Sequence, residues 1–227
     1  IIKSIIFLSI PILIGNILQS MYQLTDAFWV GRLGADAVAS VAISFPILFF
    51  IIAFTGGIGL AGGVLVSQYK GAKDHEKVNH IAGQTMLMAI FLSLIFSIIG
   101  YIFTPQIISL FGAEQTVLNN AISYHRISFI GMVFVFGYAI YQSLARGVGD
   151  AKTPVYIVLC TVILNFLLDP LFIFGWKFIP PIGVGGAAMA TVITQAIALA
   201  IGIYFMGKGK KGIHLKLKHL SLLYYVS

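Results

Sequence analysis

Polar side chains able to bind a cation occur twice inside segments that are otherwise apolar. The first set is Asn16, Gln19, Gln23 and Asp26, spaced by three, four and three residues. At about 100° per residue, these side chains fall on one face of a helix. A carboxylate inside a membrane helix costs roughly 2.5 to 3.5 kcal/mol, so it is seldom present without a partner or a task. Asp26 alone can instead be read as reaching the membrane interface, but the amides behind it favour a functional polar face.

The second set is Asn165 and Asp169, which lie one helical turn apart and are followed directly by Pro170. Proline has no N–H, so the carbonyl of Phe166 loses its usual helical partner and can turn toward a cation or water. The alternative is a proline kink with Asp169 near the interface. The rule that acids within a membrane are functional by default favours the site.

Both acids are expected at a similar depth. Asp26 and Asp169 lie about four and five residues from the predicted outer ends of their segments, which is roughly 6 to 8 Å at 1.5 Å per residue. The side chains of Thr191, Thr194 and Gln195 descend toward the same layer on one face of the last apolar segment. We therefore predict one shared cavity in the outer half of a membrane.

The elements that must hold these residues are membrane helices. The 227-residue chain is 59% hydrophobic and only 9% charged. A helix needs about 20 apolar residues to cross a bilayer core. Six stretches meet this length, so the predicted fold class is an all-α membrane protein with six transmembrane helices. They cover residues 5–30, 38–66, 81–103, 121–144, 154–174 and 182–206.

The net charge of +7 follows the predicted topology. Eleven Lys and Arg residues fall on one side of the six-span arrangement and three, Arg32, Arg126 and Lys177, on the other. This asymmetry predicts a multi-pass protein of the cell membrane with both ends of the chain in the cytoplasm. Nucleic-acid binding is not expected, because the basic residues do not form one surface with stacking or base-contacting groups.

Several residues carry structural predictions within the spans. Pro11 in the first span allows a bend or hinge, or is absorbed by packing. Gly59 and Gly63 form a GxxxG pair that permits close helix contact. Pro105 is expected just past the end of the third span. Tyr124, which opens the fourth span, is equally consistent with an aromatic anchor at the interface and with a place in the cavity.

Other patterns argue against enzyme chemistry. The glycine-rich segment 145–154 lacks the strand and the Lys-Ser/Thr pair of a phosphate loop, so a cytoplasmic connector is expected. Cys160 is the only cysteine, which excludes an internal disulfide and a thiolate metal site. No nucleophile, base and orienting group converge at one depth. We therefore predict that the protein is not an enzyme and needs no cofactor.

Together these motifs resemble a known family, the multidrug and toxic compound extrusion (MATE) transporters, and most closely their prokaryotic DNA-damage-inducible branch. The resemblance runs through essentially all six spans. It rests on Pro11 with Gln23-Leu24-Thr25-Asp26-Ala27-Phe28-Trp29-Val30-Gly31 and Leu33-Gly34, on Arg146-Gly147-Val148-Gly149-Asp150-Ala151, on Asn165-Phe166-Leu167-Leu168-Asp169-Pro170, and on Gly186-Ala187-Ala188-Met189-Ala190-Thr191.

The resemblance implies an architecture of twelve helices in two six-helix lobes with alternating access between them. Residues 1–207 match the N-terminal lobe, and 208–227 a basic cytoplasmic linker toward a second lobe, with 221–227 as the start of a further span. In similar proteins, the residues matching Asp26, Asp169, Asn165 and Thr191 form the cation or proton site. Tyr124 matches a nearby tyrosine, and Pro11 a proline at which the first helix bends.

The expected function is secondary active transport: an antiporter in which H⁺ or Na⁺ enters as a lipophilic or cationic drug is exported. Asp26, Asn165, Asp169 and Thr191 would be the metal ligands if Na⁺ couples. Gln19, Gln23, Tyr124, Thr194 and Gln195 are the candidate substrate-cavity residues. The expected partners are the lipid bilayer, a small-molecule substrate and the second lobe.

Two alternatives remain at this level. A flippase for a lipid-linked precursor would be expected to line its cavity with cationic groups, and the sequence places none within the predicted spans. A non-transporting membrane scaffold would use its polar stripes only for helix packing. In a scaffold, exchanging either Asp for Asn would be harmless.

Overall fold

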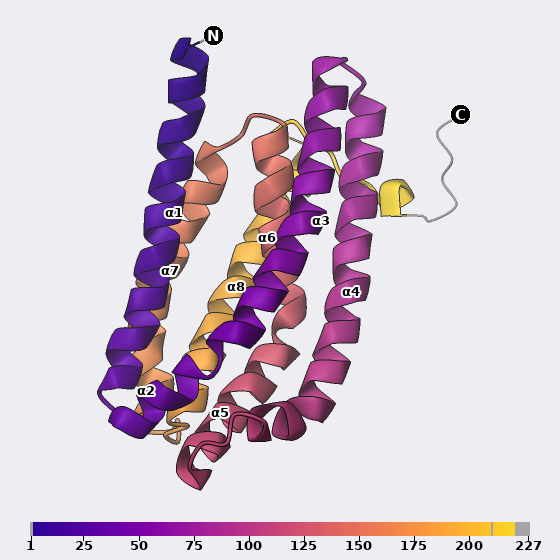
Figure 1. Cartoon of the computed structure of the whole chain (residues 1–227). Helices are drawn as coiled ribbons and strands as arrows, with labels where there is room; N and C mark the ends of the chain where they lie inside the picture. Colours follow the sequence, from indigo (N-terminus) through magenta and orange to yellow (C-terminus); the bar gives the residue numbers. More distant parts are fainter. Residues whose placement is uncertain (1, 210, 221–227) are drawn as a thin grey trace.

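A bundle of helices running roughly parallel and antiparallel to one another makes up the fold (Figure 1). The computed structural model describes residues 2–209 and 211–220. The helices are α1 Ile2–Gly31, α2 Ala35–Ala42, α3 Phe45–Gly71, α4 His75–Ser109, α5 Gln115–Ile130, α6 Met132–Gly147, α7 Lys152–Ile173, α8 Val184–Lys208 and the short 3₁₀ helix η1 Leu217–Leu220. The described residues contain no β-strand, only an isolated bridge between Trp176 and Ile179.

Length and composition make most of these helices membrane spans. Within the described residues, four helical stretches are long and apolar enough to cross a bilayer, and the bent pair of α5 and α6 makes a fifth. The four are Ala35–Gly71, His75–Ser109, Lys152–Ile173 and Val184–Lys208. The remaining predicted span is α1, which is 30 residues long and runs beside α7 (Figure 1). The prediction of an all-α membrane fold is confirmed.

The second predicted span is not one continuous helix. The sequence predicted a single span over 38–66, but α2 ends at Ala42 and α3 begins at Phe45. Pro46 lies in the first turn of α3, where its missing N–H costs nothing. A proline at that position cannot continue a helix arriving from the preceding residues, so the break follows from its chemistry.

The fourth predicted span, 121–144, is likewise broken into α5 and α6, which meet at Gly131 with a bend of 57°. Glycine has low helix propensity and is a common site of kinks. It also permits close packing here, since a Cβ at Gly131 would lie 2.1 Å from Cγ2 of Val192 in α8. The bend between α5 and α6 therefore lies at the close contact between Gly131 and Val192 of α8.

The third predicted span ends later than expected. Pro105 was placed just past its end, but α4 continues through this proline to Ser109. Membrane helices tolerate an internal proline where side-chain hydroxyls supplement the backbone hydrogen bonds. Thr104 Oγ1 donates to the carbonyl of Gly100 at 2.5 Å, one residue before the Tyr101 carbonyl that loses its donor at Pro105.

Close glycine contacts join α3 to α6, as the GxxxG pair predicted. Ser143 Oγ donates to the carbonyl of Gly59 at 2.6 Å. A Cβ at Gly63 would lie 2.9 Å from Ser143 Oγ, and one at Gly147 would lie 2.6 Å from the carbonyl oxygen of Gly63. These helices therefore approach to backbone contact, which fixes the end of α6 against α3.

The segment after α8 folds back onto the bundle. The N–H of His214 donates to Asn79 Oδ1 at 2.7 Å, and Gln84 Nε2 donates to the carbonyl of His219 at 3.1 Å. His219 is buried, and its Nε2 lies 3.4 Å from Glu76. The segment is thus packed against the start of α4. Residues 221–227, predicted to begin a further span, lie outside the described residues.

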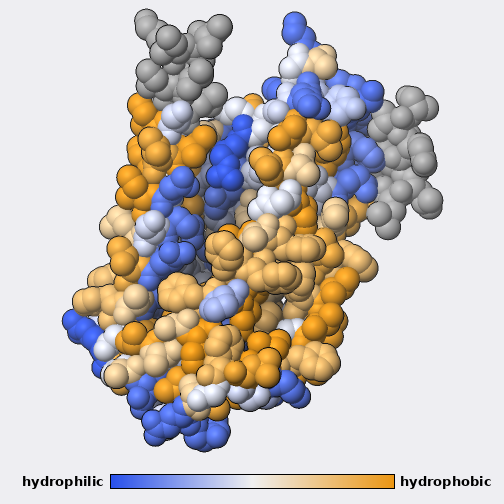
Figure 2. All heavy atoms as spheres, viewed as in Figure 1, coloured by the Kyte–Doolittle hydropathy of each residue, from blue (hydrophilic) through white to orange (hydrophobic). Residues whose placement is uncertain are grey.

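On the face shown in Figure 2, the sides of the bundle are mostly apolar, and hydrophilic atoms gather at its two ends and in one groove. Large side chains such as Phe49, Phe91 and Leu110 are exposed, as lipid-facing residues would be. Hydrophilic atoms gather in the groove between α1 and α3 (Figure 2), toward the end of the bundle that carries the N-terminus. The polar stripe of α1 therefore opens on a groove rather than on the helix packing.

Candidate functional site

Asp26 and Asp169 are brought together by α1 and α7, which pack side by side (Figure 1). Each acid lies near the end of its helix, at the end of the bundle away from the N-terminus. Asp26 Oδ2 accepts a hydrogen bond from Thr191 Oγ1 of α8 at 3.3 Å. Asp169 is completely buried, and its Oδ1 accepts from Asn165 Nδ2 at 3.2 Å. We call these four residues the acidic site.

Asp26 and Asp169 are close enough for the charge of one carboxyl group to act on the other. Two ionised carboxylates cannot hydrogen-bond, because both are acceptors only. A direct contact between Asp26 and Asp169 therefore requires a proton between them or a cation shared by both.

Three acceptor oxygens of the acidic site are buried and take no hydrogen bond from any donor in the described residues. They are Asp26 Oδ1, Asp169 Oδ2 and Asn165 Oδ1. Buried polar atoms are nearly always paired, so three unpaired acceptors in one place need an explanation. A proton or a small cation is the kind of group that would satisfy them. No cluster of three or more His, Cys, Asp or Glu residues occurs in the described part of the chain, so Na⁺ would depend on the amide and hydroxyl oxygens as well.

Tyr22 is a residue of this region that the sequence-based prediction missed. It is buried, and its hydroxyl makes a short hydrogen bond with Thr194 Oγ1. Thr194 also donates to the carbonyls of Ala190 and Thr191. Tyr22 lies four residues before Asp26 and so shares its helical face, a spacing that was available in the sequence.

Tyr124 lies in the interior rather than at a lipid interface. Its side chain is 7% exposed and packs in a cluster with Val30, Ile173 and Val184. Asp26 and Asp169 are close enough to act on it electrostatically. Of the two sequence-based readings, a place beside the cavity agrees with this position and an exposed interface anchor does not. Gln195, at 9% exposure, is also buried.

The amides of α1 do not join the acidic site. Asn16, Gln19 and Gln23 are exposed. Asn16 and Gln19 instead line a cavity of about 60 Å³ together with Pro11. The polar residues predicted on one face of α1 therefore divide between two regions. Asp26 belongs to the acidic site, and Asn16 and Gln19 line a pocket nearer the N-terminus. Pro11 lies within the single helix α1.

A membrane bundle with a buried, paired set of carboxylates is typical of ion-coupled carriers. The family model MatE matches residues 11–171 of this chain. The chain therefore belongs to the MatE family of multidrug and toxic compound extrusion proteins, as the resemblance predicted.

The curated relatives agree with this assignment. The probable multidrug resistance protein YoeA of Bacillus subtilis (strain 168) is 37% identical over 209 residues, which cover 92% of this chain and 45% of YoeA. The multidrug export protein MepA of Staphylococcus haemolyticus is 29% identical, with 96% of this chain and 47% of MepA covered. These relatives are export and resistance proteins, so the expectation that the chain is not an enzyme is confirmed.

Solved structures show the same fold. A MOP superfamily transporter from Pyrococcus furiosus, described as having a binding pocket of reverse polarity, matches with a TM-score of 0.88 and 29% identity over 96% of this chain and 48% of that one. An outward-facing MATE family transporter matches with a TM-score of 0.82, 32% identity and 96% and 48% coverage. The chain thus spans about half the length of the relatives it matches, which agrees with one lobe.

Proposed function

We propose that this chain is the N-terminal lobe of a cation-coupled exporter of lipophilic or cationic compounds, with the acidic site as its coupling site. Residues 1–207 would form the lobe and 208–227 a linker toward a second lobe. The observation that carries the proposal is the set of three buried, unpaired acceptors on Asp26, Asp169 and Asn165.

The proposed cycle follows from electrostatics. When both carboxylates are ionised, they repel each other in a buried environment, and a bound proton or cation relieves that repulsion. A cationic substrate would be attracted to the same negative charge. Substrate and coupling ion would therefore compete, so entry of the ion from outside favours release of the substrate. A ligand shifts such an equilibrium only through its different affinity for the two states.

We favour the proton over Na⁺ as the coupling ion. A proton needs only a carboxyl group to bind it, and the packing of α1 against α7 supplies two. Na⁺ would need several oxygens held around it at once, from Asn165, Thr191 and the Phe166 carbonyl as well as the acids. The sign of the charge asymmetry would place both chain ends in the cytoplasm and the acidic site toward the outside.

The test uses the intact protein in proteoliposomes and follows export of a fluorescent lipophilic cation. We expect Asp26→Asn and Asp169→Asn to reduce export to background while membrane insertion stays normal. Asp36→Asn is the matched control, because Asp36 is an exposed acid in the first turn of α2, at the same end of the bundle. Normal export by either site variant would refute the coupling role.

A flippase for a lipid-linked precursor remains the second candidate. No cationic group was expected within the spans, but Arg126 lies in α5 and Arg146 in α6, and Arg146 lines the cavity with Pro11 and Asn16. The segment 145–154 is therefore only partly a connector, since its first three residues complete α6.

A further inference from the structure

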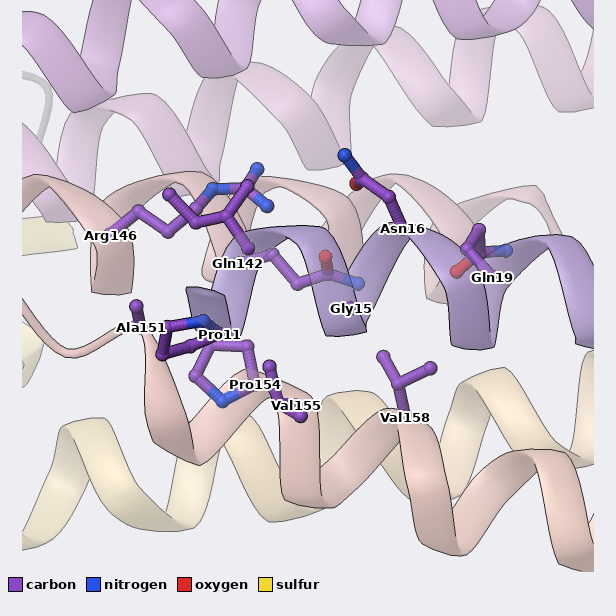
Figure 3. Close-up of a pocket in the computed structure, with 11 residues that line it drawn as sticks. Pro11, Gly15, Asn16, Gln19, Gln142, Arg146, Ala151, Pro154, Val155 and Val158 are labelled. Atoms are coloured by element: carbon purple, nitrogen blue, oxygen red, sulfur yellow. The ribbon is translucent and has the colours of Figure 1, made fainter. Parts of the chain in front are cut away.

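The cavity around Arg146 lies between α1, α6 and α7, near the N-terminal end of the bundle. Figure 3 shows Arg146 and Gln142 extending from α6 toward the part of α1 that carries Gly15 and Asn16. The lining residues are Pro11, Ile12, Gly15, Asn16, Gln19, Gln142, Arg146, Ala151, Pro154, Val155 and Val158, which we call the basic pocket.

The charge of Arg146 is not used within the lobe. Among the described residues, no ion pair joins it to a carboxylate. Asp150, four residues later, accepts at Oδ1 from the N–H of Thr153 at 3.0 Å, and its Oδ2 is buried and forms no ion pair with Arg146. A guanidinium presents five N–H donors in a planar fork that matches the oxygens of phosphate and carboxylate groups. The basic pocket therefore presents donors that suit an anion.

The surroundings of Arg146 narrow the kind of anion. Asn16 and Gln142 add amide donors on either side, while Ile12, Val155 and Val158 make the walls apolar. A volume of about 60 Å³ has room for a few water molecules or one small headgroup but not for a whole drug. Such a site suits a charged head with an apolar body attached.

We propose that the basic pocket binds the phosphate group of an anionic headgroup, through Arg146 with Asn16 and Gln142. The positive-inside distribution of charge places this end of the bundle beside the inner leaflet, where anionic lipids are concentrated. A soluble phosphate compound offers the same oxygens without the apolar body. This proposal does not depend on ion coupling at the acidic site, which lies about 15 Å away along α1 by the rise from Asn16 to Asp26.

The test is native mass spectrometry of the intact protein in detergent, titrated with dioleoyl phosphatidylglycerol. We expect Arg146→Gln to weaken retention of the lipid about tenfold or more, the usual effect of losing a hydrogen-bonded charge. Lys208→Gln is the matched control, because it removes an exposed positive charge at the same end of the bundle. Asn16→Leu is a second variant at an exposed position, where the fold tolerates change, and should weaken retention severalfold.

Competition with inorganic phosphate separates the two sources of the anion. Lipid retention that depends on Arg146 and resists excess phosphate indicates a lipid headgroup. Retention displaced by phosphate indicates a soluble phosphate compound, and both results support the pocket. Equal retention by the Arg146→Gln and Lys208→Gln variants would overturn the proposal. The proposal would also be overturned if the wild-type protein retained neither lipid nor phosphate. That result would not bear on drug export, which is tested separately.

Discussion

The acidic site and the basic pocket share helices α1 and α7 but differ in charge and in packing. Asp169 and Asn165 are completely buried, whereas Arg146 and Asn16 are exposed to the groove. Burial makes the charge of the acids costly, so they respond strongly to a proton or cation. Arg146 is more exposed than the two acids, so its charge is less costly and can be paired with an anion. On the two proposals above, one polar stripe on α1 would supply two sites with opposite preferences, one for a cation and one for an anion.

The strongest test of this contrast asks whether the acids act as one unit. We expect Asp26→Asn and Asp169→Asn each to bring export in proteoliposomes to background, and the double variant to be no worse than either single one. Residues that act together show such non-additivity. Export that falls in two separate steps would mean that the carboxylates work independently. Arg146→Gln should leave coupling to the ion gradient intact.

A second test displaces the end of α6, which carries Arg146, and leaves the charge of Arg146 in place. Gly147→Val would force the end of α6 away from Gly63, because a Cβ at 147 already lies 2.6 Å from that carbonyl oxygen. We expect a cost of about 1 to 3 kcal/mol in stability, as for other overpacked contacts, and weaker retention of phosphatidylglycerol. Thermal unfolding and native mass spectrometry measure the two effects.

Gly56→Val is the control for that experiment, since a Cβ at Gly56 meets nothing within 4 Å. It should change neither the unfolding temperature nor lipid retention. If both glycine variants behave alike, the α3–α6 contact does not position Arg146.

A smaller effect is expected at Tyr22. Tyr22→Phe removes the hydroxyl that bonds Thr194 and leaves the ring in place. The loss of one buried hydrogen bond costs about 1 kcal/mol, so we expect export to fall about fivefold, measured as the initial rate of drug export. A rate equal to wild type would remove Tyr22 from the support of the acidic site.

The smallest effect is expected at Tyr124, which serves as the matched comparison for Tyr22. Its ring packs with Val30 and Ile173, and no described hydrogen bond holds its hydroxyl. Tyr124→Phe keeps the ring and should change the export rate by less than about twofold. A larger loss than at Tyr22 would show that this hydroxyl contacts the substrate or the ion.

Local patterns in the sequence were sufficient to predict the all-α membrane fold, and they placed Asp26 and Asp169 at a common depth. Apolar length gives the spans, and the spacing of Asp26 and Asp169 from their helix ends gives a common depth. The bend at Gly131 was not predictable, because glycine is common in membrane helices. What distinguishes Gly131 is its tertiary contact with Val192, which the sequence does not reveal. Arg146 was assigned to a connector because the predicted span ended at residue 144, three residues before the end of α6, and helix ends are the least certain part of such a prediction.

The central claim is that a proton bound by Asp26 and Asp169 competes with the exported cation. It is tested most directly by adding a lipophilic cation to the intact protein in weakly buffered, sodium-free detergent solution with a pH indicator. We predict that wild type and Asp36→Asn release protons as the cation binds, and that Asp26→Asn and Asp169→Asn do not. Cation binding without proton release in the wild type, or release that persists in the double variant, would contradict the account.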